Sequence, residues 1–248
     1  MKNIIIFILL FLMFNSCSHI ADLKRTGEEI SKEFLWNGVA NVELWASVRV
    51  IPVVSNETKI ELRGMDFIVN SYELEQTDDK LIVRHNNSGH LQENKIADLL
   101  LYAPHFNRFT FNAPCKFYSA DTLHFNELNI IINGKGAYTS GYLLLKGNRL
   151  NMTIYGENNK INQTLSGNVD FANYFIEGAT NIRAANLSTN RTAITHRSNG
   201  DCYVSASELL EVYVYSNGNV YYSGSPQLNV ERRENSLMNA SGQVYQFN

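Results

Sequence analysis

Apolar and polar residues alternate in short runs along most of this chain, from Phe34 onward. Leu128, Ile130 and Ile132 occupy every second position of one run, and Leu150 to Ile154 repeats the arrangement. A period of two residues is that of a β-strand with one buried face. Glycine and asparagine separate the runs, which suits a chain that turns sharply and often. The pattern therefore predicts an all-β protein.

One three-residue phrase returns through the second half of the chain, with a β-branched residue first, a polar or aromatic residue second, and a small or turn-forming residue third. Its copies are Ile132-Asn133-Gly134, Ile154-Tyr155-Gly156, Ile176-Glu177-Gly178, Ile194-Thr195-His196 and Val214-Tyr215-Ser216, which start 22, 22, 18 and 20 residues apart. A second series of turn residues lies between the copies, so the repeating unit is two strands and two turns. A period of about 20 residues predicts a solenoid, whose coils bury their apolar edges only when stacked.

Stacked copies predict two further features. The middle residues form one outward row, made of Asn133, Tyr155, Glu177, Thr195 and Tyr215. The glycines that follow, Gly134, Gly156 and Gly178, are expected at positive φ or in tight contact between coils, because glycine adopts left-handed conformations freely.

Short strands precede the repeats. The alternation from Val42 to Val50 predicts a strand that Pro52 ends or places at a sheet edge, because proline lacks a donor. Tyr72 to Glu75 and Leu81 to Arg84 predict a hairpin. Leu99 to Ala103 is a continuous apolar run, typical of a buried strand.

The N-terminus carries an export signal. Lys2 precedes an apolar run of 11 residues, Ile4 to Phe14, whereas a membrane span needs roughly 20. Phe14-Asn15-Ser16-Cys17 resembles the lipobox of bacterial lipoproteins, although an ordinary signal peptide is the alternative. We therefore expect residues 1–16 to be a signal peptide, Cys17 to be lipidated, residues 17–33 to form a tether or a short helix, and residues 34–248 to form the body.

The formal net charge of −3 gives the protein no electrostatic preference for nucleic acid. Cys115 and Cys202 lie 87 residues apart, while the coils of a solenoid contact only their neighbours. We expect both to be buried free thiols rather than a disulfide.

The chain resembles the auto-transporter adhesin head GIN domain family of Bacteroidota lipoproteins. The resemblance spans Phe34 to Gly242 and rests on the Trp36-Asn37-Gly38-Val39 opening, Lys80-Leu81-Ile82-Val83, the apolar strand that runs into Pro104, and the closing Val220-Tyr221-Tyr222-Ser223-Gly224-Ser225-Pro226. It implies a right-handed β-helix of two sheets, similar to pectin-lyase-type solenoids, and a non-catalytic adhesion role at the cell surface or envelope. Here the Gly-Ser-Gly turns of the family have drifted, so this is a divergent member. Asp121-Thr122-Leu123 also resembles an O-glycosylation motif of Bacteroidota exported proteins.

A polysaccharide-cleaving enzyme is the first rival function. It requires two carboxyl groups that face each other, and the candidates Asp170, Glu177, Asp201 and Glu208 are scattered over the repeat. We expect no catalytic residues and no cofactor. His85 and His90 bracket a loop without a third ligand nearby, so no metal site is expected there.

Four tyrosines crowd the last coils: Tyr213, Tyr215, Tyr221 and Tyr222. Facing outward, they would form a binding patch for a glycan or for a host or envelope protein. The alternative is cross-strand packing that stiffens the end of the solenoid. A structural or assembly role, with homo-oligomers, is the second rival function.

Overall fold

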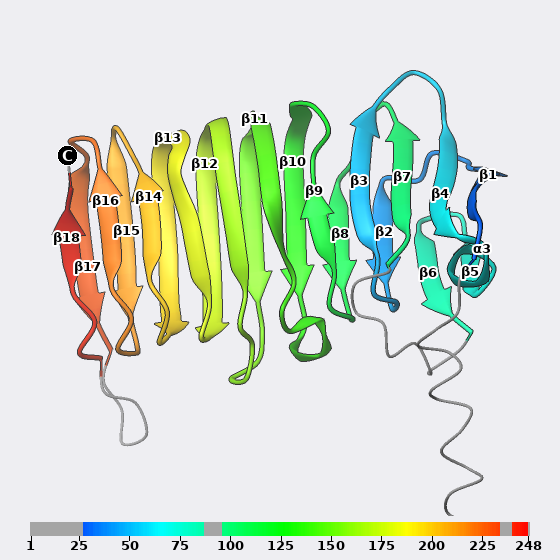
Figure 1. The fold of residues 1–248 in the computed structure, drawn as a ribbon. Helices are drawn as coiled ribbons and strands as arrows, with labels where there is room; N and C mark the ends of the chain where they lie inside the picture. The colour runs from blue at the N-terminus through cyan, green and yellow to red at the C-terminus, as the bar shows by residue number, and fades with distance from the viewer. Residues whose placement is uncertain (1–26, 87–95, 234–239, 248) are drawn as a thin grey trace, which may run out of the picture.

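The computed structural model describes residues 27–86, 96–233 and 240–247 (Figure 1). It is a β-solenoid of about six turns in which 3% of residues are helical, which confirms the predicted all-β fold. The described residues do not include 1–26, which contain Cys17 and the expected signal peptide. They do not include His90 either. No helix in the described ranges is long and apolar enough to cross a membrane.

The solenoid runs from β1 at one end to β18 at the other, and from β8 onward the elements follow one another along its axis (Figure 1). They are β1 (Glu29–Leu35), β2 (Asn41–Leu44), β3 (Arg49–Val54), β4 (Lys59–Met65), α3 (Asp66–Val69), β5 (Tyr72–Gln76), β6 (Leu81–His85), β7 (Asp98–Ala103), β8 (Arg108–Phe111), β9 (Lys116–Tyr118), β10 (Leu123–Ile132), the 3₁₀ turn η1 (Gly134–Gly136), β11 (Ser140–Ile154), β12 (Asn162–Gly178), β13 (Asn181–Ser198), β14 (Cys202–Ser205), β15 (Leu209–Val214), β16 (Val220–Ser223), β17 (Gln227–Arg232) and β18 (Val244–Gln246).

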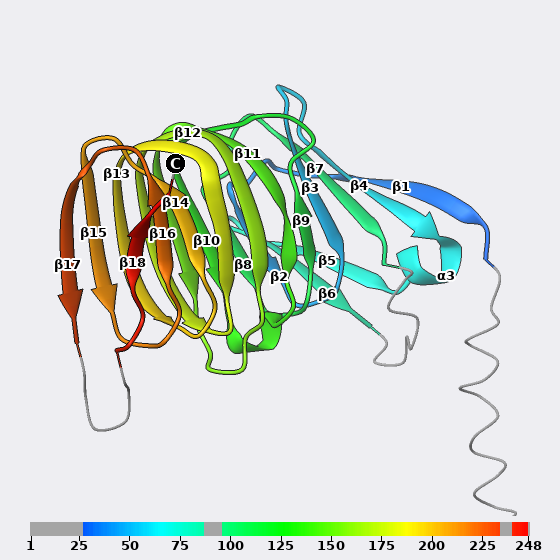
Figure 2. The same cartoon turned by 60° about the vertical axis from the view of Figure 1, so that its left-hand side comes forward.

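The strands form two layers that face each other across the core (Figure 2). Sheet A has the order β5-β6-β2-β8-β10-β11-β12-β13-β15-β17. Sheet B has the order β1-β4-β7-β3-β9-β11-β12-β13-β14-β16-β18. Strands β11, β12 and β13 bend and belong to both sheets, and the pairings of the repeats are parallel.

The sequence correctly predicts turn-forming residues halfway along each repeat. In three coils, however, these residues bend one continuous strand into a corner instead of ending it. Gly147 and Gly167 lie inside the continuous strands β11 and β12. Gly167 has φ +114°, and a Cβ there would lie 2.0 Å from the Leu145 carbonyl oxygen. Glycine therefore lets one coil bend closely over the previous coil. In the coils before and after these three the corner separates two strands, as β9 and β10 and then β14 and β15 show.

The core is a stack of inward residues from successive coils. Ile132, Ile154 and Ile176 are in register and buried. The fourth copy of the phrase was misplaced, because His196, not Ile194, pairs with Ile176. The starts of the true phrases at Ile132, Ile154, Ile176, His196 and Val214 are thus 22, 22, 20 and 18 residues apart.

The first strands behave largely as the sequence predicts. β5 and β6 form the expected antiparallel hairpin. Pro52 does not end β3. On the side of β3 that faces β9, however, only Arg49 and Val50 are paired, so the proline lies where that side of the strand has no partner. The expected tether is too long, because β1 already begins at Glu29 and pairs with β4 through residues such as Ile30. The folded body therefore starts before Phe34.

Both predicted core cysteines are buried and free, as the sequence indicates. Cys115 lies in the coil that contains β9, and Cys202 begins β14 on the same sheet. Burial raises the pKa of the Cys115 thiol to about 12, and it also raises the pKa of Cys202. Both thiols are therefore protonated at neutral pH.

Candidate functional site

One continuous row of outward side chains crosses sheet A from β2 to the end of β17. Backbone hydrogen bonds from one strand to the next fix its register: the Asn112 amide donates to the Leu44 carbonyl, and the Tyr155 amide to the Ile132 carbonyl. We call this set the Trp45 row. Its members are Trp45, Asn112, Asn133, Tyr155, Glu177, Arg197, Tyr215 and Arg233.

The Trp45 row is the outward row that the sequence predicts, with one correction. Arg197 takes the place assigned to Thr195, because Glu177 pairs with Arg197. Thr195 instead lies in register with Phe175 and Tyr213, on the neighbouring row. The predicted row missed Trp45 as well, because the first coils lack the repeated phrase.

The aromatic members of the row recur at a regular interval. Trp45 is 43% exposed and Tyr155 is 48% exposed. Tyr155 lies three strand-to-strand steps from Trp45, and Tyr215 lies three further steps from Tyr155, an interval of about 14 Å at roughly 4.8 Å per step. The intervening positions carry amides, a carboxylate and a guanidinium, so the row alternates apolar ring surface with hydrogen-bonding groups.

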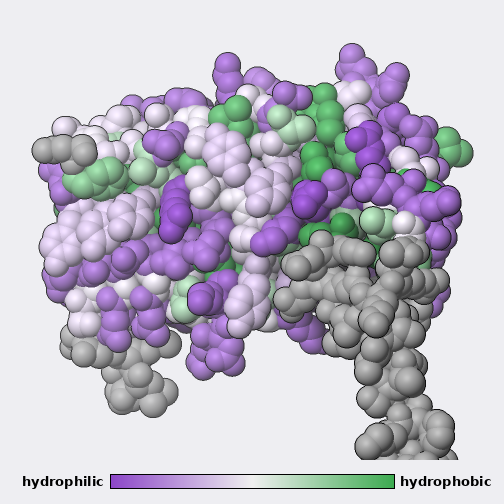
Figure 3. Space-filling model, in the orientation of Figure 1, coloured by the Kyte–Doolittle hydropathy of each residue, from purple (hydrophilic) through white to green (hydrophobic). Residues whose placement is uncertain are grey.

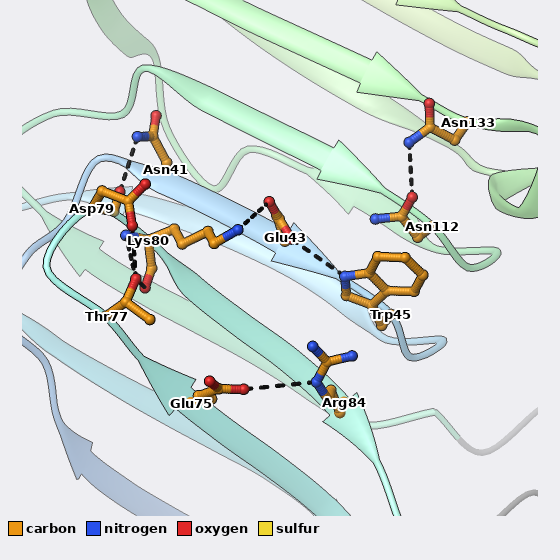
Figure 4. A network of polar contacts seen from close by, with 10 residues as sticks. All are labelled: Asn41, Glu43, Trp45, Glu75, Thr77, Asp79, Lys80, Arg84, Asn112 and Asn133. Atoms are coloured by element: carbon orange, nitrogen blue, oxygen red, sulfur yellow. Dashed lines mark hydrogen bonds and ion pairs between the residues drawn. The ribbon is translucent and has the colours of Figure 1, made fainter.

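Ionic contacts hold Trp45 in place at one end of the row (Figure 4). The Trp45 Nε1 donates to the Glu43 carboxylate at 3.4 Å, and Lys80 pairs with the other oxygen of Glu43 at 3.0 Å. The Arg84 guanidinium lies 5.6 Å from the Trp45 ring centroid and contacts Glu75 at 3.8 Å. One ring face is therefore covered by a cation, which orients the indole on the surface.

A polar hollow of about 340 Å³ lies in the middle of the row, lined by Glu157, Glu177, Gly178, Arg197, Asn199 and Ser216. The Glu177 Oε2 accepts a hydrogen bond from the Gly156 amide at 2.8 Å, and its Oε1 lies 3.8 Å from Arg197. The buried Nε of Arg197 has no hydrogen-bond partner among the described residues. The hollow thus presents a carboxylate fixed by the backbone beside a guanidinium whose side chain is 35% exposed.

Arginines and aromatic rings interleave where the row approaches the C-terminal coils. The Arg197 guanidinium lies 4.6 Å from the Tyr215 ring, and the Arg233 guanidinium lies 4.8 Å from the Tyr213 ring. Arg233 also donates to the Tyr215 hydroxyl at 3.0 Å and pairs with Glu231 at 2.7 Å. These contacts fix the planes of both tyrosine rings.

A parallel row of asparagines lies on the same face. Asn129, Asn151 and Asn173 are in register on successive strands, and the Asn151 amide donates to the Asn129 side chain at 3.1 Å. A second hollow, of about 350 Å³, lies at the start of this row between Asn129 and Asn41. The outer face of sheet A is therefore rich in amide donors and acceptors.

The four tyrosines predicted as one patch lie on different surfaces. Tyr213 and Tyr215 face outward on sheet A, whereas Tyr221 lies on β16 in sheet B. Tyr222 packs against the core. The prediction of one patch is wrong, because the coil reverses between β15 and β16 and carries the two strands to opposite layers.

Tyr221 belongs to a second outward row, which we call the Tyr221 row. Its members are Tyr118, Tyr142, Thr164, Arg183, Tyr203, Tyr221 and Tyr245, paired strand by strand along sheet B. Members of this row are widely separated in the sequence, so only the register brings them together. Figure 3 shows that one face of the molecule carries mostly hydrophilic and intermediate side chains, with apolar ones in smaller groups.

The candidate catalytic carboxylates do not gather in one cleft. Glu177 lines the hollow on sheet A, and Asp201 accepts from the Asn219 amide at 3.0 Å near the start of β14. Asp170 and Glu208 share an exposed corner, two coils apart, with Asn190 between them. Among the carboxylates near the Trp45 row, Glu157 lines the same hollow as Glu177.

No group of three or more metal-ligating side chains occurs within residues 27–86, 96–233 and 240–247. His85 contacts the Ser71 hydroxyl at 2.7 Å and the Tyr72 ring at 5.2 Å. These contacts tie His85 to the N-terminal strands.

Solved structures share this fold. A "putative adhesin" from Bacteroides fragilis is 19% identical with a TM-score of 0.76, and covers 90% of this chain and 98% of its own. A "putative lipid binding protein" from Parabacteroides distasonis is 14% identical with a TM-score of 0.65, and a "putative adhesin" from Parabacteroides merdae is 16% identical with a TM-score of 0.64. Both cover 90% of this chain and 98% of their own. No curated protein matches the chain.

The model of one protein family matches residues 40–226, from just before β2 to the turn after β16. That family is described as "Putative auto-transporter adhesin, head GIN domain". The match covers most of both sheets and lies within the Phe34 to Gly242 span of the resemblance inferred from the residues. The chain therefore belongs to the auto-transporter adhesin head GIN domain family.

Proposed function

We propose that this protein is a non-catalytic lipoprotein of the cell envelope, anchored through Cys17, whose solenoid binds an extended glycan along the Trp45 row. The adhesin family fits a binding module. The observation that carries the glycan assignment is the regular alternation along sheet A, in which an aromatic ring follows every two hydrogen-bonding positions. A sugar chain offers ring faces that stack on aromatic side chains and hydroxyls that pair with amides and charged groups.

The geometry favours a bound chain over a single small molecule. Trp45 and Tyr155 are exposed on one open face, about 14 Å apart. The hollow beside Glu177 and Arg197 lies between Tyr155 and Tyr215, where it would hold one residue of the chain by charge-assisted hydrogen bonds.

The binding test uses defined probes. The non-lipidated Cys17→Ser chain is applied to an array of immobilised oligosaccharides and to mucin O-glycans, and hits are measured by calorimetry. We expect Trp45→Ala and Tyr155→Ala each to weaken binding about tenfold or more, as loss of a stacked ring typically does. Tyr142→Ala is the matched control, because Tyr142 is similarly exposed on sheet B. Equal losses in all three variants, or no binding at all, would remove the glycan assignment.

The same preparation tests the absence of catalysis. Glu157 and Glu177 line one hollow, and a pair of carboxylates is what glycoside hydrolysis requires. Any bound glycan is therefore incubated with the protein and assayed for new reducing ends. We expect none, and release that disappears in Glu177→Gln would make this a glycan-cleaving enzyme instead.

The anchor is tested separately on cells. A non-penetrating protease is added to intact cells that carry the native chain or the Cys17→Ser variant, with a periplasmic protein as the marker of integrity. Digestion of the native chain with an intact marker supports surface exposure. Release of the native chain into the soluble fraction, as for Cys17→Ser, would contradict lipid anchoring.

A further inference from the structure

We infer that the C-terminal end of the solenoid is a self-association surface, on which a second copy of this chain docks tail to tail. The two ends of the molecule differ. At the N-terminal end, β1 and β5 run antiparallel to their neighbours, and α3 packs Ile68 and Val69 into the core. Figure 1 shows α3 beside β1 and β5 at that end. Such elements cap a solenoid.

The last coil leaves core positions uncovered. Leu228 and Val230 on β17 are in register with Leu210 and Val212, which are buried in the preceding coil. Yet Leu228 is 40% exposed and Val230 is 36% exposed. Their register is that of inward residues, and no strand among the described residues covers them.

Both sheets also end here with an unpaired strand. Within the described ranges, β17 pairs with β15 alone and β18 with β16 alone. An open edge is a template for another strand unless charge or proline blocks it. On β17 the inward charge is Arg232, whose guanidinium donates to Gln243 of the same coil at 3.0 Å. The stretch from Gln227 to Val230 carries no charge.

The free edge is complementary to itself under a two-fold rotation. In an antiparallel pairing centred on Asn229, Leu228 lies opposite Val230 of the second copy, and Val230 opposite Leu228 of the second copy. Gln227 then faces Glu231 of the second copy, so no like charges oppose each other. An axis perpendicular to the layers keeps the inward faces on one side in both copies. It therefore joins the two cores and lets β18 approach its own copy in the same way.

This symmetry closes at two copies. In the pair, the C-terminal end of each chain is covered by the other copy, and the N-terminal end is capped. The assembly therefore does not grow into a fibre. A strand of this length spans about 20 Å, and the end face is about 20 Å deep once the side chains of both layers are included, so it buries on the order of 400 Å² per copy. The total of about 800 Å² for two copies is below the standard size of specific interfaces, so the dimer should be weak and concentration-dependent.

The arrangement would deepen the proposed adhesion role, and this step rests on that proposal. β1 and β17 lie at opposite ends of the solenoid (Figure 1). With each copy anchored near its N-terminus, a tail-to-tail pair carries its two anchors at its far ends. The pair would thus bridge two membranes, and many weak contacts between such surfaces would add up through avidity.

Sedimentation velocity of the Cys17→Ser chain over a wide concentration range tests the dimer without glycan or membrane, so its outcome is independent of the proposed function. We expect a monomer–dimer equilibrium. Val230→Lys should weaken dimerisation at least about tenfold, because it places a charge in the shared core. Leu35→Lys, on the edge strand β1 at the other end, should leave it unchanged.

A crosslinking arm does not depend on how Val230→Lys folds. Asn229→Cys lies on the proposed axis and should form a disulfide-linked dimer under mild oxidation, since directly opposed residues have suitable Cα spacing. Glu211→Cys, at the same outward position one coil earlier, should not. A strictly monomeric chain, loss of the dimer in Leu35→Lys but not Val230→Lys, or equal crosslinking of the two cysteine variants would each overturn the inference.

Discussion

The rings of Tyr203 and Tyr221 stack with 4.7 Å between their centroids and 11° between their planes. Tyr245 continues the stack at 5.6 Å from Tyr221. The spacing is close to the separation of neighbouring strands, so each ring covers a face of the next. The stack therefore presents ring edges rather than open ring faces to a ligand, and we assign it to stiffening the last coils.

Replacing Tyr221 by alanine should thus affect stability rather than binding. The variant loses two ring contacts, so we expect the free energy of unfolding to fall by about 1–2 kcal/mol. Urea denaturation measures the change, with Tyr138→Ala as a control for an exposed tyrosine outside the row. Normal stability with lost glycan binding would instead assign Tyr221 to the binding site.

Replacing the glycines between coils by valine should lower the free energy of unfolding by different amounts at different positions. Gly178 has φ +77°, and a Cβ there would lie 2.6 Å from the Asn159 carbonyl oxygen. Gly156 has φ +114°, with the Gly134 Cα at 3.0 Å. We expect Gly156→Val and Gly178→Val each to cost more than about 2 kcal/mol.

Gly134 is the matched control for these variants, and here the sequence-based expectation is wrong. It lies in the turn η1 without a positive φ, and the nearest atom to a Cβ is 4.0 Å away. Gly134→Val should cost less than about 1 kcal/mol. Chemical denaturation of the three variants would contradict this account if the losses were equal.

Acid should destabilise the protein through His196. Burial lowers the pKa of this imidazole to about 4, partly opposed by Asp201. The unfolded chain binds the proton near pH 6.5, so between these values the unfolded state holds more protons. The contribution of His196 should be constant above about pH 6.5 and fall by roughly 3 kcal/mol as the pH drops towards 4.

His196→Leu should remove that decline, because leucine suits a position stacked between Ile176 and Val214. Denaturant unfolding at neutral and acidic pH gives the comparison, and the exposed His124→Gln variant should keep the wild-type profile. An unchanged acid profile in His196→Leu would mean that other groups govern acid unfolding.

The two cysteines should be unreactive in the folded protein. Both are buried, and burial raises the pKa of both thiols. A thiol reagent at pH 8 should therefore label neither in the Cys17→Ser chain, because the thiolate is the reacting form. Both thiols should react with the reagent once denaturant is added. If the two cysteines formed a disulfide, neither would be labelled even in denaturant.

Much of the fold could be predicted because local chemistry determines it. The alternation around Leu128–Ile132 sets strand faces, and Gly147 and Gly167 mark where β11 and β12 bend. What periodicity could not show is whether such a glycine ends a strand or bends it. That depends on how closely the coil below approaches, which is a tertiary contact.

The candidate site was predicted in part for a related reason. The row through Tyr155 and Glu177 follows from the repeated phrase, but the fourth coil holds a histidine where the others hold an apolar residue. The sequence therefore pointed to Ile194, and Thr195 was assigned in place of Arg197. Trp45 has no repeat around it, so only the pairing of β2 with β8 adds it to the row.

The sequence by itself determined the strands, the solenoid and the inward residues, since each depends on the spacing of residues along the chain. Tertiary structure alone decided which outward side chains become neighbours. Tyr213 and Tyr221 are eight residues apart and lie on opposite layers, whereas Tyr118 and Tyr142 are 24 residues apart and paired. The physical reason is that strand register, not sequence distance, sets proximity between coils, and register is fixed by the packing of the core beneath.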